Sequence, residues 1–322
     1  MEESYLILTE AGNQIGLGHY KRCCSIQQEM YDQNKSCEMF LYFRGELNLN
    51  ISSDLVFDWK TESDLLIKKA DEIKTVLIDS YLACASFYEF CTNIYHSVVV
   101  IDDYNRIDYG PIDLLLNPNP YFDYFNYNNQ KAKKIEGGEN YVIISRPFQD
   151  LFLEKDITSY ETSKIVVFLG GSDYRNLLPI VLSNLIDLEE KNIQVIVGNI
   201  EDQLIVEEKF KTLDVHINLS SDEMFTAFNS AKLVVTGCGQ SLHELAVLRK
   251  PTIGICIDID QELNQKFYLN NGFLKTKLSY KSIENIKEEI RNVLRSNSKI
   301  EGPDISTNGI KNILSLIDYV GD

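Results

Sequence analysis

A histidine directly follows a glycine pair in the stretch IGLGHYKRC, residues 15–23. An apolar run precedes the stretch, and a segment with helical spacing of apolar residues follows it. Gly16 and Gly18 let the backbone turn tightly and approach a ligand, and a helix N-terminus favours the neutral form of a nearby imidazole. A neutral His19 can accept a proton from water. The spacing alone supports two interpretations equally: a general base, and a helix-entry residue hydrogen-bonded to the backbone.

Carboxylates end two further apolar runs. Asp79, Ser80 and Tyr81 end the run VLIDSY, and Asp102 and Asp103 end the run VVVIDD. An Asp after a strand is often only a helix cap or a turn former, so each carries that interpretation beside a functional one. Two adjacent carboxylates can also bind a metal ion. Since no His or Cys stands at ligand spacing, we expect no metal site.

Two glycine-containing segments follow apolar runs in the second half of the chain. LGGSD, before a helical pattern, offers backbone donors to a diphosphate, and the alternative is a plain capping turn. TGCGQSLHE also leads into a helix, with small residues that can face phosphate and a glutamate that can face ribose hydroxyls. It matches neither a Walker loop nor a dinucleotide motif. The candidate residues are Gly170, Gly171, Ser172, Asp173, Gly239, Gln240, Ser241 and Glu244.

A last polar stretch, IDIDQELNQ, follows the apolar run PTIGICI. Asp260 and Gln261 in this stretch face the same crevice as the preceding loop if the sheet is doubly wound. The alternative is a solvated helix N-terminus with favourable acidic charge.

Short apolar runs alternate with amphipathic segments along the whole chain, which predicts parallel sheets in an α/β fold. We expect two domains of this kind, with a boundary near residues 149–162: an N-terminal domain (1–150), a C-terminal domain (151–305) and a closing C-terminal helix (306–322). In such sheets ligands bind beyond the carboxyl ends of the strands, where these candidate residues stand.

Composition limits the function classes. The 322 residues suffice for two domains, and a net charge of −17 argues against nucleic acid or anionic lipid as a general partner. No apolar run is long enough to span a bilayer and the start resembles no secretory signal, so we expect a cytoplasmic protein without membrane insertion. Seven cysteines without a CxxC pair indicate buried reduced thiols.

Taken together, these segments resemble one family over nearly the whole chain: the UDP-2,4-diacetamido-2,4,6-trideoxy-β-L-altropyranose hydrolases of pseudaminic acid biosynthesis (PseG). Eight stretches match in order. They are IGLGHYKRC, LIDSY, VVIDD, DLLLNPN, ENYVIISRPF, FLGGSD with Asn176, GCGQSLHELAVLRKP, and the DQ pair at residues 260–261.

This resemblance implies a GT-B-like, MurG-like fold: two Rossmann-like doubly wound domains with a cleft between them, the N-terminal one with the catalytic histidine and the C-terminal one binding UDP. It also implies a UDP-sugar substrate. It implies that His19 activates water for attack at the anomeric carbon with inversion, releasing UDP as the product without any cofactor. Tyr81 would lie on the sugar side with Gly16, Gly18, Asp79, Asp260 and Gln261. The loops at residues 170–173 and 239–241 would hold uracil and diphosphate, and Glu244 would hold the ribose.

Two positions depart from the family pattern. The first strand ends in LTEAG where members commonly carry RxDxS, so the Arg is missing and Glu10 stands in for the acid. Asp260 stands where an Asn is usual. Both changes touch sugar-side positions and leave the identity of the sugar open.

Two alternatives remain. A MurG-like glycosyltransferase would pass the sugar to an acceptor and would need an apolar, basic patch, which the helix candidates lack. A non-catalytic UDP-sugar-binding subunit would have the same fold without the chemistry, because function lies in the site and not in the fold.

Overall fold

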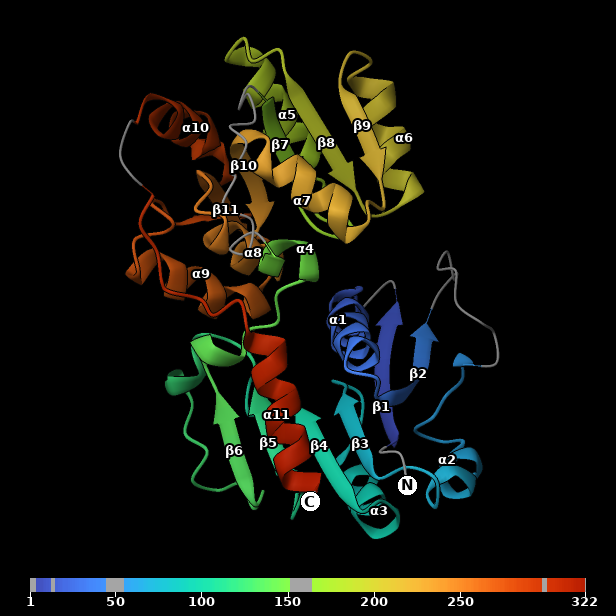
Figure 1. Ribbon diagram of the computed structural model, residues 1–322. Helices are drawn as coiled ribbons and strands as arrows, with labels where there is room; N and C mark the ends of the chain where they lie inside the picture. Colours follow the sequence, from blue (N-terminus) through green and yellow to red (C-terminus); the bar gives the residue numbers. More distant parts are fainter. Residues whose placement is uncertain (1–3, 13–14, 45–54, 151–163, 297–299, 322) are drawn as a thin grey trace. The chain divides into compact units, whose positions relative to one another are not determined.

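The computed structural model describes residues 4–12, 15–44, 55–150, 164–296 and 300–321. They form two compact units, each built around one parallel sheet (Figure 1). The first unit contains the described residues up to Ile144 and those from Ser306 onward, and the second contains those from Ser145 to Ile305. The boundary predicted from the sequence falls mostly on residues 151–163, which lie outside the described residues.

Six parallel strands form the sheet of the first unit, in the order β2-β1-β3-β4-β5-β6. Strands covered by helices on both faces need apolar side chains along their length. This explains why the runs TVLID and SVVVI, which form β3 and β4, are buried at every position. The strands are β1 (Ser4–Gly12), β2 (Ser36–Arg44), β3 (Thr75–Asp79), β4 (Ser97–Ile101), β5 (Leu114–Asn117) and β6 (Lys134–Gly137).

Helices pack on both faces of this sheet. Apolar residues of α1 and α11 share one cluster with Ile7 and Leu77, while residues of α3 share the other with Leu6 and Leu8. The helix α11 begins at Gly309, where a Cβ would lie 1.9 Å from the Val142 carbonyl oxygen, so only glycine fits. The helices are α1 (Gly18–Asp32), α2 (Ser63–Lys69), α3 (Ala85–Ile94) and α11 (Gly309–Gly321), with short 3₁₀ turns η2 (Phe122–Tyr124) and η3 (Glu139–Tyr141).

The second unit is built on the sheet β12-β11-β10-β7-β8-β9, also parallel throughout. Residues 145–150, which the sequence analysis placed in the first domain, pack here: the Phe148 ring lies edge-on to Phe225, with 5.3 Å between centroids. The strands are β7 (Lys164–Phe168), β8 (Ile193–Val197), β9 (Asp214–Ile217), β10 (Ala231–Gly237), β11 (Thr252–Cys256) and β12 (Leu278–Ser279). The helices are α4 (Arg146–Asp150), α5 (Leu178–Asp187), α6 (Ile200–Lys209), α7 (Ser221–Asn229), α8 (Ser241–Val247), α9 (Glu262–Asn270) and α10 (Ile286–Arg295), with 3₁₀ turns η4 (Ile259–Gln261) and η5 (Ile283–Asn285).

Each sheet has a point where the strand order reverses. In the first sheet β1 lies between β2 and β3, and in the second β7 lies between β8 and β10. The loops after the two strands at such a point diverge, which leaves room for a ligand at their carboxyl ends. The doubly wound sheets predicted from the sequence are confirmed. The fold places the segments after β1, β3, β7 and β10 at these reversal points.

No helix in the described ranges has both the length and the apolar content needed to cross a membrane.

Candidate active site

His19 lies in the first turn of α1, where the chain has turned back from β1. Two backbone hydrogen bonds close this turn, from Gly12 N to Gly16 O at 3.1 Å and from Gly16 N to Gly12 O at 2.7 Å. Gly16 has a φ of 79°, which glycine adopts without strain. A Cβ on Gly18 would meet open space, so packing does not require the second glycine. The turn leaves only 6% of His19 exposed.

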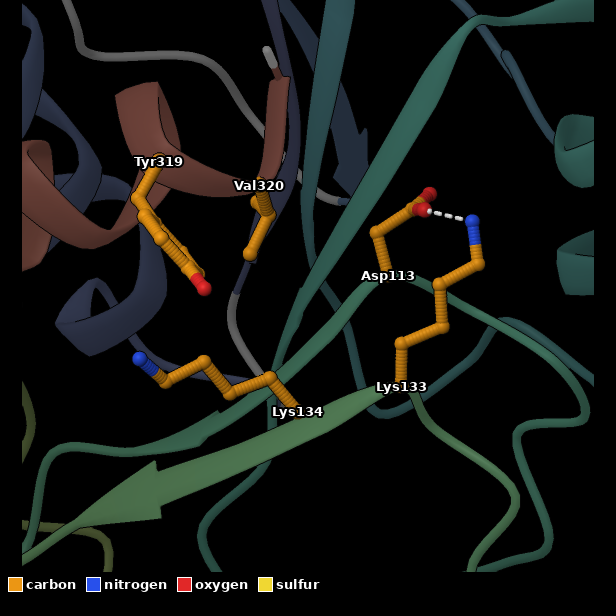
Figure 2. Close-up of a pocket in the computed structure, with 5 residues that line it drawn as sticks. All are labelled: Asp113, Lys133, Lys134, Tyr319 and Val320. Carbon is orange, nitrogen blue, oxygen red and sulfur yellow. Dashed lines mark hydrogen bonds and ion pairs between the residues drawn. The ribbon is translucent and has the colours of Figure 1, made fainter.

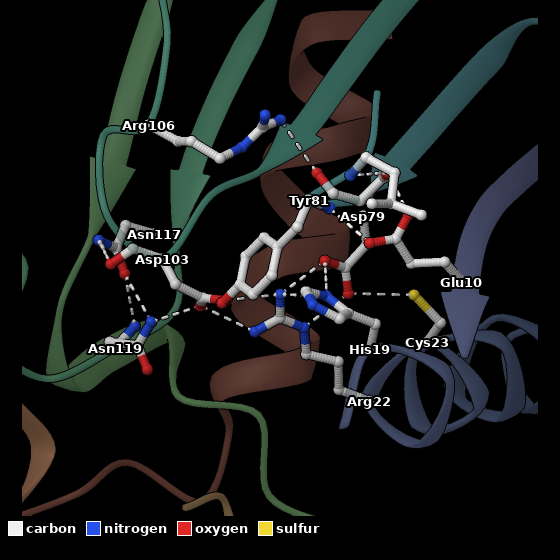
Figure 3. Close-up of polar contacts among 12 residues, drawn as sticks. Glu10, His19, Arg22, Cys23, Asp79, Tyr81, Asp103, Arg106, Asn117 and Asn119 are labelled. Carbon is white, nitrogen blue, oxygen red and sulfur yellow. Dashed lines mark hydrogen bonds and ion pairs between the residues drawn. The ribbon is translucent and has the colours of Figure 1, made fainter. Parts of the chain in front are cut away.

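The imidazole bonds to a side chain. His19 Nδ1 lies 2.7 Å from Asp79 Oδ1 (Figure 3). Asp79 is fully buried at the carboxyl end of β3, the strand that pairs with β1. The partner is therefore a buried carboxylate, and not the backbone group that the helix-entry interpretation of His19 requires.

Arg22, which the sequence analysis did not single out, joins two carboxylates to this pair. Its Nε and Nη2 donate to Asp79 at 2.6 and 2.5 Å, and its Nη1 and Nη2 donate to Asp103 at 2.8 and 3.0 Å. Each carboxylate thus occupies one edge of the guanidinium in the two-bond geometry that Arg favours. Arg22 follows His19 by three residues on α1, a spacing that places both side chains on one helix face. That spacing was the signal in the sequence.

Counting hydrogens assigns the tautomer of His19. The two hydrogens of Arg22 Nη2 go to Asp79 and Asp103, so none remains for His19 Nδ1, although Nη2 lies 3.1 Å from it. Nδ1 therefore carries its own hydrogen and donates it to Asp79. In the neutral form of the imidazole, the lone pair is then on Nε2, as in histidines that act as general bases.

The charges in this cluster support one another. Burial alone would raise the pKa of Asp79 and Asp103, but the Arg22 charge and its hydrogen bonds outweigh burial and hold both below the usual range. Burial raises the pKa of Tyr81 far above normal, and the Asp103 charge raises it further. Both carboxylates are therefore ionised at neutral pH, and Tyr81 stays a neutral hydrogen-bond donor.

Tyr81 contacts both His19 and Asp103. Its hydroxyl donates to Asp103 Oδ2 at 2.7 Å, and its ring lies edge-on to the imidazole at 4.3 Å between centroids. Its backbone N–H donates to Glu10 Oε1 at 2.7 Å, and the Ser80 hydroxyl also donates to the Glu10 carboxylate. Glu10, fully buried at the end of β1, thus anchors the loop that carries Tyr81.

The adjacent residues Asp102 and Asp103 have different roles. Asp102 accepts weakly from the Arg106 backbone N–H at 3.3 and 3.4 Å, which fits the turn-former interpretation. Asp103 also accepts from Asn119 Nδ2 at 2.6 Å and belongs to the His19 cluster. In the described part of the chain, no three His, Cys, Asp or Glu residues are grouped so that they could hold a metal ion.

The loop after β7 presents backbone more than side chains. Gly170 has a φ of 113°, and the next two residues, Gly171 and Ser172, are exposed. The next side chain is already used: Asp173 accepts from the N–H groups of Leu177 and Leu178, both at 2.8 Å. Asp173 therefore caps the helix α5, as the capping alternative proposed, while the glycines before it leave their backbone accessible.

The loop after β10 is held by amide side chains from the segment that follows β11. Gln261 Oε1 accepts from Cys238 N at 3.0 Å and from Ile257 N at 3.1 Å. Asn264 Nδ2 donates to the carbonyls of Cys238 and Gly239. Gln261, which the resemblance places on the sugar side, therefore fixes the shape of this loop through its oxygen.

The other predicted residues of the second unit lie around the same edge of the sheet. Gly239, Gln240 and Ser241 are half-buried where α8 begins, and Glu244 accepts from Ser145 Oγ at 2.5 Å. Asp260 is exposed. All of these residues belong to the second unit, whereas His19, Asp79 and Tyr81 belong to the first.

Two surface pockets lie away from the carboxyl ends of the strands. One of about 360 Å³ is lined by Asp113 and Lys133, which precede β5 and β6, and by Lys134 and Tyr319 (Figure 2). The other, of about 620 Å³, lies beside α2. The first is at the amino ends of its strands, opposite the His19 cluster, so neither pocket changes the assignment of the site.

The seven cysteines are free thiols. Five are buried and Cys24 is half-buried, but Cys84 is exposed, so the prediction of burial is wrong there. The reason is local: Cys84 is the N-cap residue of α3, in the loop after β3.

No protein-family model and no curated protein matches the chain. Solved structures match over nearly the full length. MurG from Acinetobacter baumannii matches with 10% identity and a TM-score of 0.59, over 98% of this chain and 99% of that chain. S. aureus MnaA, solved with UDP, matches with 10% identity and a TM-score of 0.64, over 98% and 96%.

The UDP-GlcNAc 2-epimerase from Neisseria meningitidis, bound to UDP-GlcNAc, matches with 12% identity and a TM-score of 0.60, over 98% of this chain and all of that chain. At such identities the likeness shows the fold. The chain has the GT-B fold of two Rossmann-like α/β domains, as expected.

Proposed function

We propose that the protein is an enzyme acting on UDP-linked sugars, and specifically a hydrolase that releases UDP from a UDP-linked 2,4-diacetamido-2,4,6-trideoxy sugar. The observation that carries the proposal is the His19–Asp79 pair at the reversal point of the first sheet. A buried carboxylate that holds an imidazole by Nδ1 leaves Nε2 ready to take a proton from water. The family resemblance of the sequence motifs supplies the substrate class.

The reaction needs one base. The water oxygen attacks the anomeric carbon, its proton passes to His19 Nε2, and the bond between that carbon and the diphosphate oxygen breaks. UDP leaves with the bonding electron pair, and a single displacement inverts the anomeric carbon. UDP is a good leaving group once donors meet its charge, so no acid is required on its side.

The second unit would hold the UDP portion. The loop at Gly170–Ser172 leaves glycine backbone accessible, and the loop at Gly239–Ser241 leads into α8. Backbone N–H groups at such turns bind phosphate without any net positive charge, which suits a chain of charge −17. The same fold occurs in S. aureus MnaA, which was solved with UDP, and this supports UDP as a ligand of the proposed site.

Two other reactions of UDP-sugars are supported by the fold. MurG from Acinetobacter baumannii has it, which favours a glycosyltransferase that gives the sugar to an acceptor. The Neisseria meningitidis UDP-GlcNAc 2-epimerase also has it, which favours an enzyme that changes the sugar's configuration. A binding subunit without activity would share the fold as well.

The test is UDP release from a panel of UDP-sugars in the absence of any acceptor. The panel includes the UDP-linked 2,4-diacetamido-2,4,6-trideoxy sugars and UDP-GlcNAc, and the released sugar is analysed at early times by NMR for its anomeric configuration. We expect UDP and the inverted sugar. His19→Ala should lower turnover by about 10²–10⁴-fold, the contribution of a general base. UDP affinity should stay within about twofold, since in the proposed reaction His19 acts on water and not on UDP. His96→Ala is the matched control, because His96 is exposed in the same unit.

Each other outcome selects an alternative. UDP release only with an acceptor would indicate the transferase, and a changed sugar still linked to UDP would indicate the epimerase. Binding without turnover of any UDP-sugar would indicate the silent subunit. Full activity of His19→Ala would falsify the catalytic assignment of His19.

A further inference from the structure

We infer that Asp103 is a positioning residue for His19: acting through Arg22, it fixes the tautomer of the imidazole and strengthens Nε2 as a proton acceptor. The inference deepens the proposed function and rests on it for the role of Nε2. It starts from one nitrogen. Arg22 Nη2 lies 2.5 Å from Asp79 Oδ1, 3.0 Å from Asp103 Oδ2 and 3.1 Å from His19 Nδ1.

Asp103 decides where the hydrogens of that nitrogen point. With Asp103 present, both Nη2 hydrogens have carboxylate acceptors, and His19 Nδ1 must keep its own hydrogen. Without the Asp103 carboxylate, one hydrogen of Nη2 loses its charged acceptor and can compete for Nδ1, which lies 3.1 Å away. Asp79 still accepts from Nδ1, so only a fraction of the protein would carry the imidazole hydrogen on Nε2, and that fraction could not accept a proton there.

Asp103 also sets the charge beside the imidazole. Asp79 and Asp103 are at most 5% exposed, and Arg22 is 8% exposed. Two carboxylates around one guanidinium leave a net negative charge in a largely desolvated place, where charges interact strongly. Proton uptake by His19 neutralises this charge. The cluster therefore favours the imidazolium that forms as water is deprotonated.

Two asparagines at and just after the end of β5 anchor Asp103. Asn119 Nδ2 donates to Asp103 Oδ1 at 2.6 Å, and Asn117 Nδ2 donates to the Asp103 carbonyl at 3.2 Å (Figure 3). Asn117 Nδ2 also donates to Tyr127 Oη at 2.8 Å. Tyr127 stacks on Phe122, with 5.0 Å between ring centroids. The aromatic, Asn-rich segment at residues 121–130 thus ends a hydrogen-bonded chain that starts at His19.

The titratable and charged groups near His19 come from every element packed around it. Arg22 and Cys23 lie on α1, Asp79 ends β3, Tyr81 follows it, Asp103 follows β4, and Glu10 ends β1 behind the Ser80–Tyr81 loop. The pKa of the Cys23 thiol is raised far above normal by burial, so it is neutral. Asp79 bonds directly to Nδ1, whereas Asp103 acts on it through Arg22, so the negative charge of Asp103 can be removed without breaking the bond to Nδ1.

The test is an NMR titration of His19 in the full chain, without substrate. The chain has only four histidines, so His19→Ala assigns the signal. We expect Asp103→Asn to lower the midpoint of the His19 titration by about one pH unit, the shift typical of losing one nearby opposite charge. Asp108→Asn is the matched control, because Asp108 is exposed and pairs with Lys131. In this variant the His19 titration should have the same midpoint as in the wild type.

Nitrogen-15 shifts of the wild-type protein test the tautomer without any variant. Above the titration midpoint, His19 should carry its hydrogen on Nδ1, and in Asp103→Asn part of the signal should move to the Nε2–H form. The inference is overturned if the wild type shows Nε2–H, or if a folded Asp103→Asn keeps the wild-type midpoint. Because neither readout uses turnover, failure of the hydrolase proposal would leave both results interpretable.

Discussion

The two sheets reverse their strand order in the same way but fill that point with different chemistry. At the reversal point of the first unit, the side chains of His19, Arg22, Asp79 and Asp103 are buried and bonded to one another. At that of the second unit, the side chain of Asp173 serves to cap a helix and the accessible groups are glycine backbone.

This difference teaches how one fold serves two tasks. Charged side chains held by each other can move a proton, while backbone N–H groups held by caps can bind an anion without charge of their own. The comparison predicts that the first unit is sensitive to substitutions that remove a buried charge. The second unit should be sensitive to substitutions that block access to its glycine backbone. The following experiments test both halves.

Arg22→Met should have the largest effect on stability. It leaves the carboxylates of Asp79 and Asp103 buried without a cation, which typically costs about 3–5 kcal/mol. Urea unfolding followed by Trp59 fluorescence measures it, because this is the single tryptophan of the chain and it is fully buried in the first unit. Arg175→Met, which removes a half-exposed ion pair with Asp258, should lower the urea midpoint far less, as followed by circular dichroism.

A triple variant separates charge from packing. Arg22→Met combined with Asp79→Asn and Asp103→Asn removes the unpaired charges and should recover most of the lost stability. An Arg22→Met protein that unfolds at the wild-type urea concentration would contradict the role of the ion pairs.

Much of this arrangement could be predicted from the sequence, because strand ends carry the chemistry in parallel sheets. The apolar runs located β1, β3, β7 and β10, and the residues just after them are the ones now found at the reversal points. The neighbours of each side chain could not be predicted. The His19–Asp79 bond spans 60 positions and depends on β3 pairing with β1, which the alternation of strands and helices does not specify.

The sequence could not decide between the two interpretations of Asp173, and it did not reveal the role of Gln261, for another reason. Both carry side chains suited to a ligand, but both bond to backbone N–H groups instead. Local hydrogen bonds of this kind compete with any ligand, and only coordinates show which partner a side chain has taken. Arg22 was overlooked because a basic residue on a helix is usually solvated.

Acid should destabilise the first unit. The pKa values of Asp79 and Asp103 lie below their values in the unfolded chain, near 3.9, because Arg22 outweighs burial. The contribution of these two carboxylates to the free energy of unfolding is therefore complete above about pH 5 and is lost as the pH falls below about 4. Trp59-detected urea unfolding between pH 7 and pH 3 measures this loss.

The second unit should respond with the opposite sign at Asp173. Burial raises the pKa of that carboxyl, so the folded state holds its proton more tightly, and stability rises as the pH falls through the raised value.

Asp103→Asn supplies the control for the acid prediction in the first unit, because removing one titrating group must reduce the acid dependence of the urea unfolding that Trp59 reports. An unchanged dependence in that variant would rule out Asp103 as its source.

Gln261→Met should cost about 1–3 kcal/mol, because the N–H groups of Cys238 and Ile257 lose their shared acceptor. Gln261→Glu keeps an oxygen acceptor and should remain within about 1 kcal/mol of the wild type, which makes it the matched comparison. Gln203→Met controls for the loss of a surface amide, since Gln203 bonds only to Glu207 on the same helix. Equal stability of Gln261→Met and Gln203→Met would show that the loop does not depend on Gln261.

The smallest change gives the sharpest contrast: one methyl group at each reversal point. A Cβ on Gly171 or on Gly18 would meet no atom within 4 Å, and neither residue has a positive φ. Both Gly→Ala variants should therefore be as stable as the wild type, or more stable by about 0.4–1 kcal/mol.

Their ligand effects should differ. If the loop after β7 holds the nucleotide as proposed, Gly171→Ala puts a methyl group in its approach to the backbone, and UDP affinity measured by calorimetry should fall about tenfold, or 1.4 kcal/mol. Gly18→Ala should leave UDP affinity unchanged and lower the rate of UDP release, because its methyl group stands beside His19. If Gly171→Ala binds UDP with wild-type affinity, the loop after β7 is not the nucleotide site. The contrast between the two units would then rest on the His19 cluster alone.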